Sequence, residues 1–267
     1  MSEKPIGFFD SGIGGLTVVK KFIELKPNEN IVYIGDEARM PYGDREPEEI
    51  ISFSRQIANF LIEQYHIKML VVACNTATAV ALPSLQSELS IPVIGVIESG
   101  GRYVTEIESS NIGVIATRAT VKADAYAKTI HKYKENRNVY SKPEPEFVPI
   151  VESGQSNTQR TFEFVKSQLS QWTKDNQIDT LVLGCTHFPL LLEPIRKAVG
   201  PDVRIIDSGT IEAMDARDLI DEKEIANSEK LSFRKYLTTG DLARFEKLAT
   251  EWLGGELDVS YVDLEEL

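Results

Sequence analysis

The chain has 267 residues, which at roughly 100–200 residues per domain indicates one large domain or two of modest size. Hydrophobic residues make up 42% and charged residues 26%, the composition of a globular protein rather than a disordered or fibrous one. The 29 Lys and Arg against 41 Asp and Glu give a net charge of −12. This charge argues against nucleic acid as a ligand, because phosphate backbones are held by clustered Lys and Arg.

No apolar run reaches the roughly 18–20 residues that cross a bilayer, and the first residues, MSEKPIGFFDSG, lack the apolar core of a signal peptide. Two cysteines are too few for a disulfide scaffold. We therefore expect a cytoplasmic protein without membrane contact.

Strand and helix patterns alternate along the first hundred residues. Short apolar runs predict strands, and apolar residues at helical spacing predict helices. The predicted strands are 6–9, 30–36, 68–74 and 92–96, and the predicted helices are 16–25, 47–65 and 76–89. This rhythm is typical of a mostly parallel sheet with helices on both faces.

The same rhythm begins again after residue 110. The predicted strands are 111–117, 146–151, 179–185 and 203–207, and the predicted helices are 124–133, 159–172 and 189–200. The tail contains one clear helix, capped by Asp241 and ended by Gly254. Polar composition predicts solvated loops at 134–146 and 221–230, and a solvated edge at the acidic end, VDLEEL.

The two halves resemble each other in sequence. Residues 6–8 correspond to 112–114, and five residues between 67 and 83 match the residues 111 positions later. The only two cysteines, Cys74 and Cys185, form one of these pairs. This match indicates an internal duplication.

We therefore predict an α/β fold of two similar doubly wound lobes related by pseudo-twofold symmetry, with the active site in the cleft between them. The first lobe comprises 1–97 together with 208–267, and the second comprises 98–207.

Each cysteine stands where an apolar strand ends, in VVACNTATA and VLGCTHFPLL. The carboxyl ends of parallel strands form the crevice where ligands bind, and a following helix N-terminus favours the thiolate. Two thiols facing each other suit the inversion of a carbon-bound proton: one thiolate removes the proton, and the other thiol delivers one to the opposite face. The alternative for either cysteine is a small buried hydrophobe.

Further polar groups follow the predicted strands. Asp10 and Ser11 lead into a glycine-rich turn, whose N–H groups can hold a substrate carboxylate or whose glycines simply allow tight packing. The turn is not a P-loop, because no Gly-Lys-Ser/Thr follows. Asn75-Thr76 and Thr186-His187 directly follow the cysteines, where they can cap helices, bind a ligand, or both.

Four motifs in this order and spacing resemble the cofactor-independent glutamate racemases of the aspartate/glutamate racemase family. They are FDSGIGGLTV at 9–18, MPYGDR at 40–45, VACNTATA around Cys74 and LGCTHFPLL around Cys185. The resemblance extends to about Asp207. It implies interconversion of L- and D-glutamate without pyridoxal phosphate or metal, with the D form used for bacterial peptidoglycan, and often a homodimer. The family usually has Tyr where this chain has Phe188, so any hydrogen bond through that hydroxyl is in question.

The resemblance also implies which residues form the site. The catalytic residues are Cys74, Cys185, Asp10, His187 and Glu152, and the substrate contacts are Asp10, Ser11, Tyr42, Gly43, Asn75, Thr76, Thr186 and His187. By the same analogy, Cys185 takes the proton from L-glutamate and Cys74 takes it from D-glutamate. Asp36 is a weaker candidate, for which a surface carboxylate is the ordinary explanation.

Three alternatives remain at this point. A racemase for aspartate or another amino acid is the nearest, since the sequence does not give the volume of the site. The second is a redox protein that cycles Cys74 and Cys185, although they are not in a C-x-x-C arrangement. The third is a metal-binding or interaction module built on Cys185 and His187, which lacks ligands for a tetrahedral zinc site.

Overall fold

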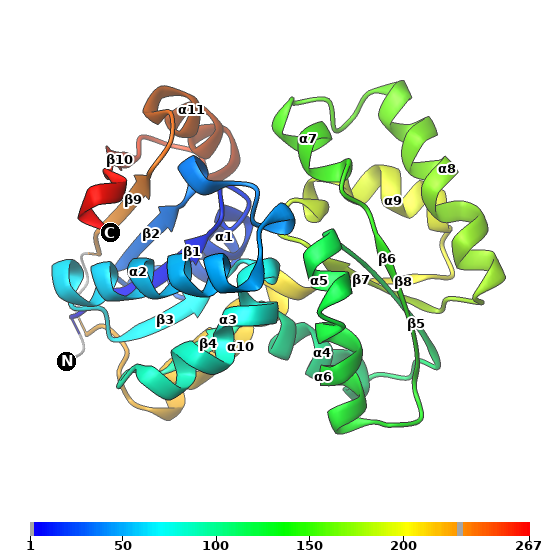
Figure 1. The fold of residues 1–267 in the computed structure, drawn as a ribbon, viewed down its shortest axis with the longest axis horizontal. Coiled ribbons are helices and arrows are strands. Elements are labelled where there is room, and N and C mark those ends of the chain that lie inside the picture. Colours follow the sequence, from blue (N-terminus) through cyan, green and yellow to red (C-terminus); the bar gives the residue numbers. More distant parts are fainter. Residues whose placement is uncertain (1–2, 229–231) are drawn as a thin grey trace. The chain divides into compact units, whose positions relative to one another are not determined.

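The computed structural model describes residues 3–228 and 232–267 (Figure 1). The chain forms two compact units. Unit 1 runs to Val96 and resumes at Gly209, and unit 2 comprises Ile97–Ser208.

Unit 1 is built on a six-stranded sheet in the order β10-β9-β2-β1-β3-β4, in which every paired strand is parallel. Its strands are β1 (Ile6–Asp10), β2 (Ile31–Gly35), β3 (Met69–Val72), β4 (Val93–Gly95), β9 (Arg234–Thr238) and β10 (Asp258–Tyr261). Its helices are α1 (Leu16–Leu25), α2 (Pro47–Tyr65), α3 (Asn75–Glu88), α10 (Ser208–Glu222) and α11 (Leu242–Leu253), with short 3₁₀ turns η1 (Glu37–Arg39), η2 (Tyr42–Asp44) and η4 (Leu264–Glu266).

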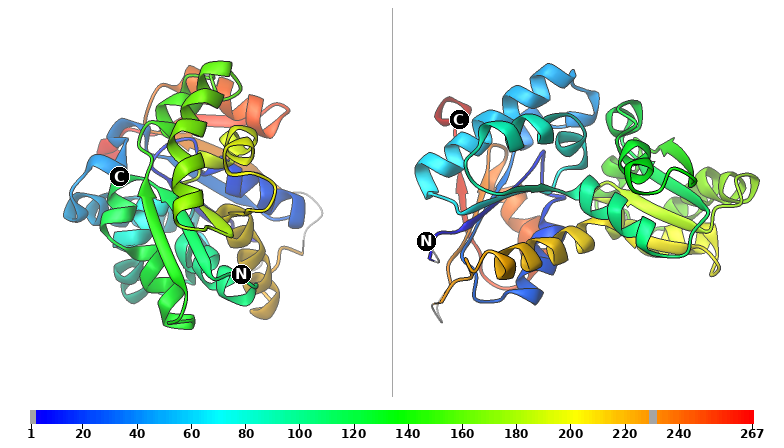
Figure 2. Two further views of the ribbon diagram at one scale, coloured as in Figure 1. Left: turned by 90° about the vertical axis from the view of Figure 1, so that its right-hand side faces the viewer. Right: turned by 90° about the horizontal axis from the view of Figure 1, so that it is seen from below.

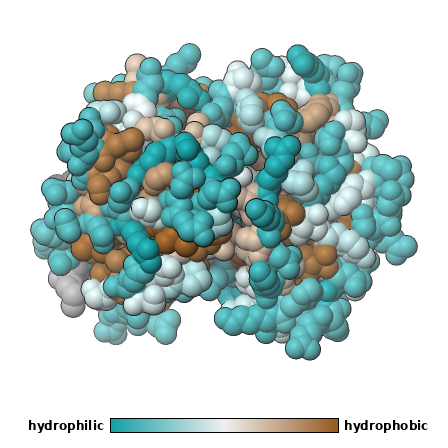
Figure 3. Space-filling view, viewed as in Figure 1, coloured by the Kyte–Doolittle hydropathy of each residue, from teal (hydrophilic) through white to brown (hydrophobic). Residues whose placement is uncertain are grey.

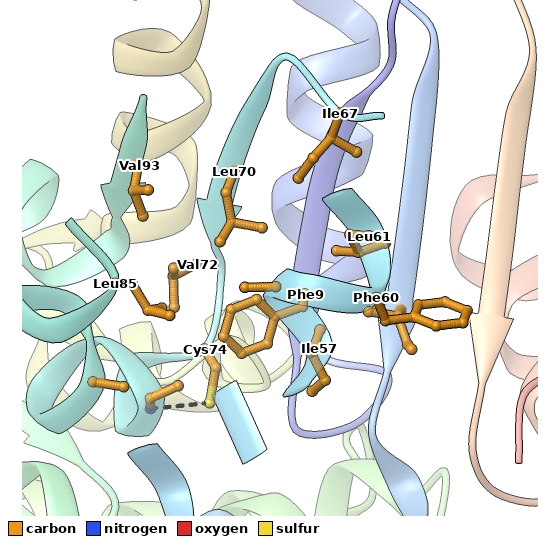
Figure 4. Packing of buried hydrophobic residues seen from close by; sticks show 14 of the residues in the cluster. Phe9, Ile57, Phe60, Leu61, Ile67, Leu70, Val72, Cys74, Leu85 and Val93 are labelled. Carbon is orange, nitrogen blue, oxygen red and sulfur yellow. Dashed lines mark hydrogen bonds between the residues drawn. The ribbon is translucent and has the colours of Figure 1, made fainter. Parts of the chain in front are cut away.

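Helices cover both faces of this sheet because the strands are apolar on both faces. Phe9 and its neighbours on one face pack under α2 and α3, and Phe8 on the other face packs under α1, α10 and α11. Figure 4 shows the first of these layers, with Phe9, Val72 and Leu85 packed together and Cys74 at its edge. The core therefore extends directly to the thiol.

Unit 2 is built on a four-stranded parallel sheet in the order β6-β5-β7-β8. Its strands are β5 (Asn111–Ala116), β6 (Asn138–Pro143), β7 (Thr180–Gly184) and β8 (Arg204–Asp207). Its helices are α4 (Val96–Glu106), α5 (Arg118–Lys122), α6 (Ala125–Tyr133), α7 (Phe147–Glu152), α8 (Gln159–Asp175) and α9 (Leu192–Val199), with the 3₁₀ turn η3 (Phe188–Leu191). In Figure 2, helices lie on both sides of this sheet, and α8 packs against α9. The predicted α/β fold with two parallel sheets is confirmed.

The two sheets share one strand order. The run β2-β1-β3-β4 in unit 1 corresponds to β6-β5-β7-β8 in unit 2. The register agrees as well, since Gly7 pairs with Leu70 and Gly113 pairs with Leu181. These are residues that the sequence comparison placed in equivalent positions, so the structure supports the duplication.

The glycines of β1 and β5 are buried under equivalent side chains. A Cβ on Gly7 would lie 2.8 Å from Ile67 Cδ1, and a Cβ on Gly113 would lie 3.0 Å from Ile178 Cγ2. Ile67 and Ile178 are themselves an equivalent pair. Glycine is present in both strands because an isoleucine just before the neighbouring strand, β3 or β7, packs directly onto the backbone there.

The prediction for residues 134–151 is wrong. The expected loop contains strand β6, and the expected strand 146–151 forms helix α7. Strand β6 lies at the sheet edge and is mostly half-buried, which explains its polar sequence. Phe147 and Val151 are four residues apart, so a helix turns both toward the core, where they are buried.

Other elements were not predicted. Strands β9 and β10 complete the sheet of unit 1 from the tail, and α4 and α10 follow β4 and β8 directly. The sequence does not indicate α4 because it contains Gly100 and Gly101, and glycine has a low helix propensity. Close packing accounts for both glycines, since a Cβ on Gly100 would lie 2.4 Å from Ser208 Oγ and a Cβ on Gly101 would lie 2.7 Å from Thr129 Cγ2. Of the predicted loop 221–230, residues 221–222 belong to α10, and 229–230 lie outside the described residues.

Within the described ranges, no helix has the length and apolar character needed to cross a bilayer. On the face shown in Figure 3, hydrophilic side chains cover most of the surface of each unit, and apolar side chains form scattered patches.

Candidate active site

Apart from the weaker candidate Asp36, seven of the candidate residues lie in unit 1 and four in unit 2. The unit 1 group is Asp10, Ser11, Tyr42, Gly43, Cys74, Asn75 and Thr76, and the unit 2 group is Glu152, Cys185, Thr186 and His187. Each group follows the carboxyl ends of the strands of its own sheet, as the parallel topology requires.

Cys74 lies between the end of β3 and the first turn of α3 and is 3% exposed. Its Sγ accepts the N–H of Ala77 at 3.4 Å, the dashed line in Figure 4, and the thiol donates to Ser11 Oγ at 3.6 Å. Burial raises the pKa of Cys74, and the Asp10 carboxylate raises it further, whereas the bonds from Ala77 and Ser11 lower it. The N–H of Ala77 at the helix terminus thus lowers the pKa, as expected from the sequence, but burial outweighs it and the balance favours the protonated thiol.

Asp10 ends β1 and is 1% exposed. Its Oδ2 accepts the N–H of Gly15 at 2.8 Å, so that N–H is engaged within the protein. A Cβ on Gly15 would lie 2.7 Å from Asp10 Cβ. At Gly15, therefore, the glycine serves the tight turn that positions Asp10 beside Cys74.

Tyr42 and Gly43 begin the short turn η2, after a cis peptide bond between Met40 and Pro41. The Tyr42 ring is 1% exposed, and its hydroxyl donates to Asp36 Oδ2 at 2.5 Å. Burial and the Asp36 charge raise the pKa of Tyr42, so its phenol remains a donor. Since the phenol is used within the protein, a ligand would meet the backbone of this turn.

Asp36 is not the surface carboxylate that the sequence suggests, since its side chain is fully buried. It accepts hydrogen bonds from Tyr42, from Arg39 Nε at 2.6 Å and from Thr239 Oγ1 at 2.9 Å. Its observed partners make it an anchor of the loop that carries Tyr42. The sequence gives no indication that Thr239 contacts Asp36, because the two residues lie 203 positions apart in the chain.

Asn75 and Thr76 are the first two residues of α3, and both are 3% exposed. The N-cap of α3 is Cys74, whose sulfur accepts the Ala77 N–H, so neither Asn75 nor Thr76 caps this helix. Thr186, the corresponding residue after Cys185, is 6% exposed. These polar side chains thus lie inside the protein, and in the sequence they directly follow the two cysteines.

Cys185 directly follows β7 and is 6% exposed. Its Sγ lies 3.8 Å from His187 Nδ1, and His187 Nε2 lies 3.1 Å from Glu152 Oε1. The imidazole is 4% exposed and the Glu152 side chain 12% exposed. The structure therefore brings these three groups together as a thiol–imidazole–carboxylate series.

Glu152 ends helix α7, not a strand as the sequence predicts. Helix α7 is held against η3 by the rings of Phe147 and Phe188, whose centroids are 5.2 Å apart at an interplanar angle of 64°. Phe188 is fully buried, so the ring at this position packs against α7. This packing connects the helix of Glu152 to the turn that follows Cys185.

The fold and the candidate site define an α/β protein with one buried thiol at the carboxyl end of the same strand in each of two like sheets. The model of the Asp/Glu/Hydantoin racemase family matches residues 17–216. A glutamate racemase from Pediococcus pentosaceus is 44% identical over 267 residues, covering 99% of this chain and 100% of that protein.

Solved structures agree. A glutamate racemase isoform from Bacillus anthracis has a TM-score of 0.94 and 41% identity, with 99% of each chain covered. A glutamate racemase from Francisella tularensis in complex with D-glutamate has a TM-score of 0.93 and 37% identity, with 100% of each chain covered. The chain therefore belongs to the Asp/Glu/Hydantoin racemase family, which confirms the resemblance seen in the motifs and makes the protein an isomerase.

Proposed function

We propose that this protein is a cofactor-independent glutamate racemase that uses Cys74 and Cys185 as its two acid–base groups. One observation carries the proposal: two buried thiols occupy equivalent strand ends, after β3 and after β7, in a racemase-family chain. Inversion at a carbon needs two groups that exchange a proton with opposite faces, and two equivalent thiols supply such a pair.

In the direction from L- to D-glutamate, the Cys185 thiolate takes the α-proton, so the Cα–H bond breaks and an S–H bond forms. The electron pair stays on the α-carbon, which then takes a proton from the Cys74 thiol on the other face. Cys74 is left as the thiolate and Cys185 as the thiol, and the reverse reaction restores both. The assignment of Cys185 to the L enantiomer follows the family resemblance.

The surroundings of Cys74 agree with this assignment. Its raised pKa favours the protonated form, which is the form that delivers a proton to the carbanion. Asp10 and Ser11 face this thiol, so they guide its proton and the substrate ammonium.

The surroundings of Cys185 supply a route to its thiolate. The Glu152 carboxylate is an acceptor, so His187 carries its proton on Nε2 and offers the Nδ1 lone pair to Cys185, 3.8 Å away. His187 then acts as the base that removes the thiol proton, and Glu152 holds the required tautomer.

The remaining candidates bind the substrate in this proposal. Ser11, Asn75, Thr76 and Thr186 supply hydroxyl and amide groups close to the thiols. With the Tyr42 phenol engaged by Asp36, the backbone N–H groups of Tyr42 and Gly43 donate to a substrate carboxylate.

Glutamate is the favoured substrate because relatives with 37–44% identity over nearly the whole chain are named glutamate racemases. The test is the circular dichroism of pure L-glutamate in heavy water with the protein and no added cofactor. The proposal predicts loss of signal with deuterium at the α-carbon. A stable signal with L-glutamate, alongside racemisation of aspartate, would contradict the choice of substrate. A stable signal with every amino acid tested would contradict racemisation itself.

In the cell, we propose that the protein works in the cytoplasm as a homodimer and supplies D-glutamate for peptidoglycan synthesis. Light scattering after gel filtration tests the dimer. Depletion of the protein tests the role, since growth should stop with cell-wall defects and recover when D-glutamate is added.

A further inference from the structure

The end of strand β9 lies beside the end of strand β2. The two strands are parallel neighbours, and Gly35 pairs with Thr238. The next residue, Thr239, therefore meets the loop that follows β2 and leads to Tyr42. Thr239 lies beyond the part of the chain that the family model matches, residues 17–216.

One hydroxyl group holds this loop by two bonds. Thr239 Oγ1 donates to Asp36 Oδ1 at 2.9 Å and accepts the N–H of Ala38 at 3.0 Å. In addition, the N–H of Thr239 donates to the carbonyl of Gly35 at 3.2 Å. Thr239 is 3% exposed and Asp36 fully buried, so water does not readily replace these bonds.

The other oxygen of Asp36 continues the connection. Asp36 Oδ2 accepts the Tyr42 hydroxyl at 2.5 Å and Arg39 Nε at 2.6 Å. The Tyr42 ring packs against Phe53, with centroids 5.7 Å apart. A continuous series of bonds thus runs from Thr239 through Asp36 to Tyr42, and it fixes where the backbone of the Tyr42–Gly43 turn lies.

We propose that Thr239 is a positioning residue for substrate binding, acting through Asp36 and Tyr42 on the backbone N–H groups of Tyr42 and Gly43. The inference rests on the proposed function, because those N–H groups receive a substrate carboxylate only if the protein binds glutamate. It gives a role to the C-terminal part of unit 1, which carries no recognisable motif. We assign Thr239 to substrate binding rather than to proton transfer, because its observed contacts are with Gly35, Asp36 and Ala38 and not with either thiol.

The experiment compares three variants with the wild type in the racemisation of L-glutamate. Thr239→Val has nearly the same shape and loses both side-chain bonds, and it should raise KM roughly tenfold with kcat changed much less. Thr239→Ser keeps the hydroxyl and should restore KM to within about twofold of the wild type. Thr238→Val is the matched control: it removes a neighbouring buried hydroxyl that bonds Glu37 Oε2 and the N–H of Gly240, both at 3.0 Å, but not Asp36. Because the connection to Tyr42 runs through Asp36, this variant should raise KM much less than Thr239→Val does.

A double variant tests whether Thr239 acts through Asp36 and Tyr42. In a Tyr42→Phe background, adding Thr239→Val should raise KM little further, because the connection is already broken. Should Thr239→Val fail to fold, Thr239→Ala against Thr239→Ser gives the same comparison.

An unchanged KM in Thr239→Val, an equal increase in Thr238→Val, or full additivity with Tyr42→Phe would overturn the inference and leave the proposed function intact. A wild-type protein that does not racemise glutamate would overturn the proposed function, and the inference with it.

Discussion

Replacing Glu152 by Gln tests how the Cys185 thiol is activated. Glu152 Oε1 lies 3.1 Å from His187 Nε2, and the two side chains are 12% and 4% exposed. A hydrogen bond to a charged group contributes about 1.5–3 kcal/mol and a neutral one about 0.5–1.5 kcal/mol. The amide keeps the shape and one acceptor but loses the charge, so the difference is on the order of 1–1.5 kcal/mol, or about tenfold in rate.

We expect kcat/KM of Glu152→Gln to fall about tenfold, and equally in both directions, since the two enantiomers have the same free energy. Circular dichroism of L- and of D-glutamate measures both values. Glu163→Gln, on the exposed surface of α8, is the matched control and should behave as the wild type. In a His187→Asn background, Glu152→Gln should cost little more. If kcat/KM of Glu152→Gln stayed within about twofold of the wild type, Glu152 would not act through His187.

Two further predictions follow from the packing and from the thiol. Gly7→Ala and Gly113→Ala should each lower the free energy of unfolding by about 1–2 kcal/mol in urea, because each Cβ would press on a buried side chain; stabilisation by both would contradict the packing. In Cys185→Ser, the thiolate absorbance of Cys74 should appear at higher pH than that of free cysteine, and Asp10→Asn should move it to lower pH. The folded protein thus keeps a proton that the unfolded chain releases, so the free energy of unfolding should fall as the pH rises above about 8.5, the ordinary pKa of cysteine. Titration of Cys74 at that ordinary pKa would contradict the prediction.

Much of the fold could be predicted because its strands are buried on both faces. Such strands are continuous apolar runs, as in β1, β3 and β7, and the helices between them show a clear apolar face. The duplication could be seen for the same reason, since the central strands and the cysteines that end them repeat. Edge strand β6 is mostly half-buried and polar, so its sequence resembles a loop. The apolar run after it predicts a strand, although it forms helix α7.

The candidate site could be predicted where its residues are neighbours in the chain. Cys74 with Asn75, and Cys185 with His187, are each only one or two residues apart. Contacts made by folding could not be predicted: Thr239 reaches Asp36, and Glu152 reaches His187 from helix α7, where the sequence predicts a strand. The raised pKa of Cys74 could not be predicted either, because burial is a property of the folded protein and not of the motif.

The most direct test of the two-thiol account uses the variants Cys74→Ser and Cys185→Ser in heavy water. Each keeps one thiol, so neither should racemise glutamate, and each should still exchange the α-proton of one enantiomer without inversion. We expect Cys74→Ser to place deuterium in L-glutamate and Cys185→Ser to place it in D-glutamate, as nuclear magnetic resonance would show. Full racemisation by either variant would contradict the account.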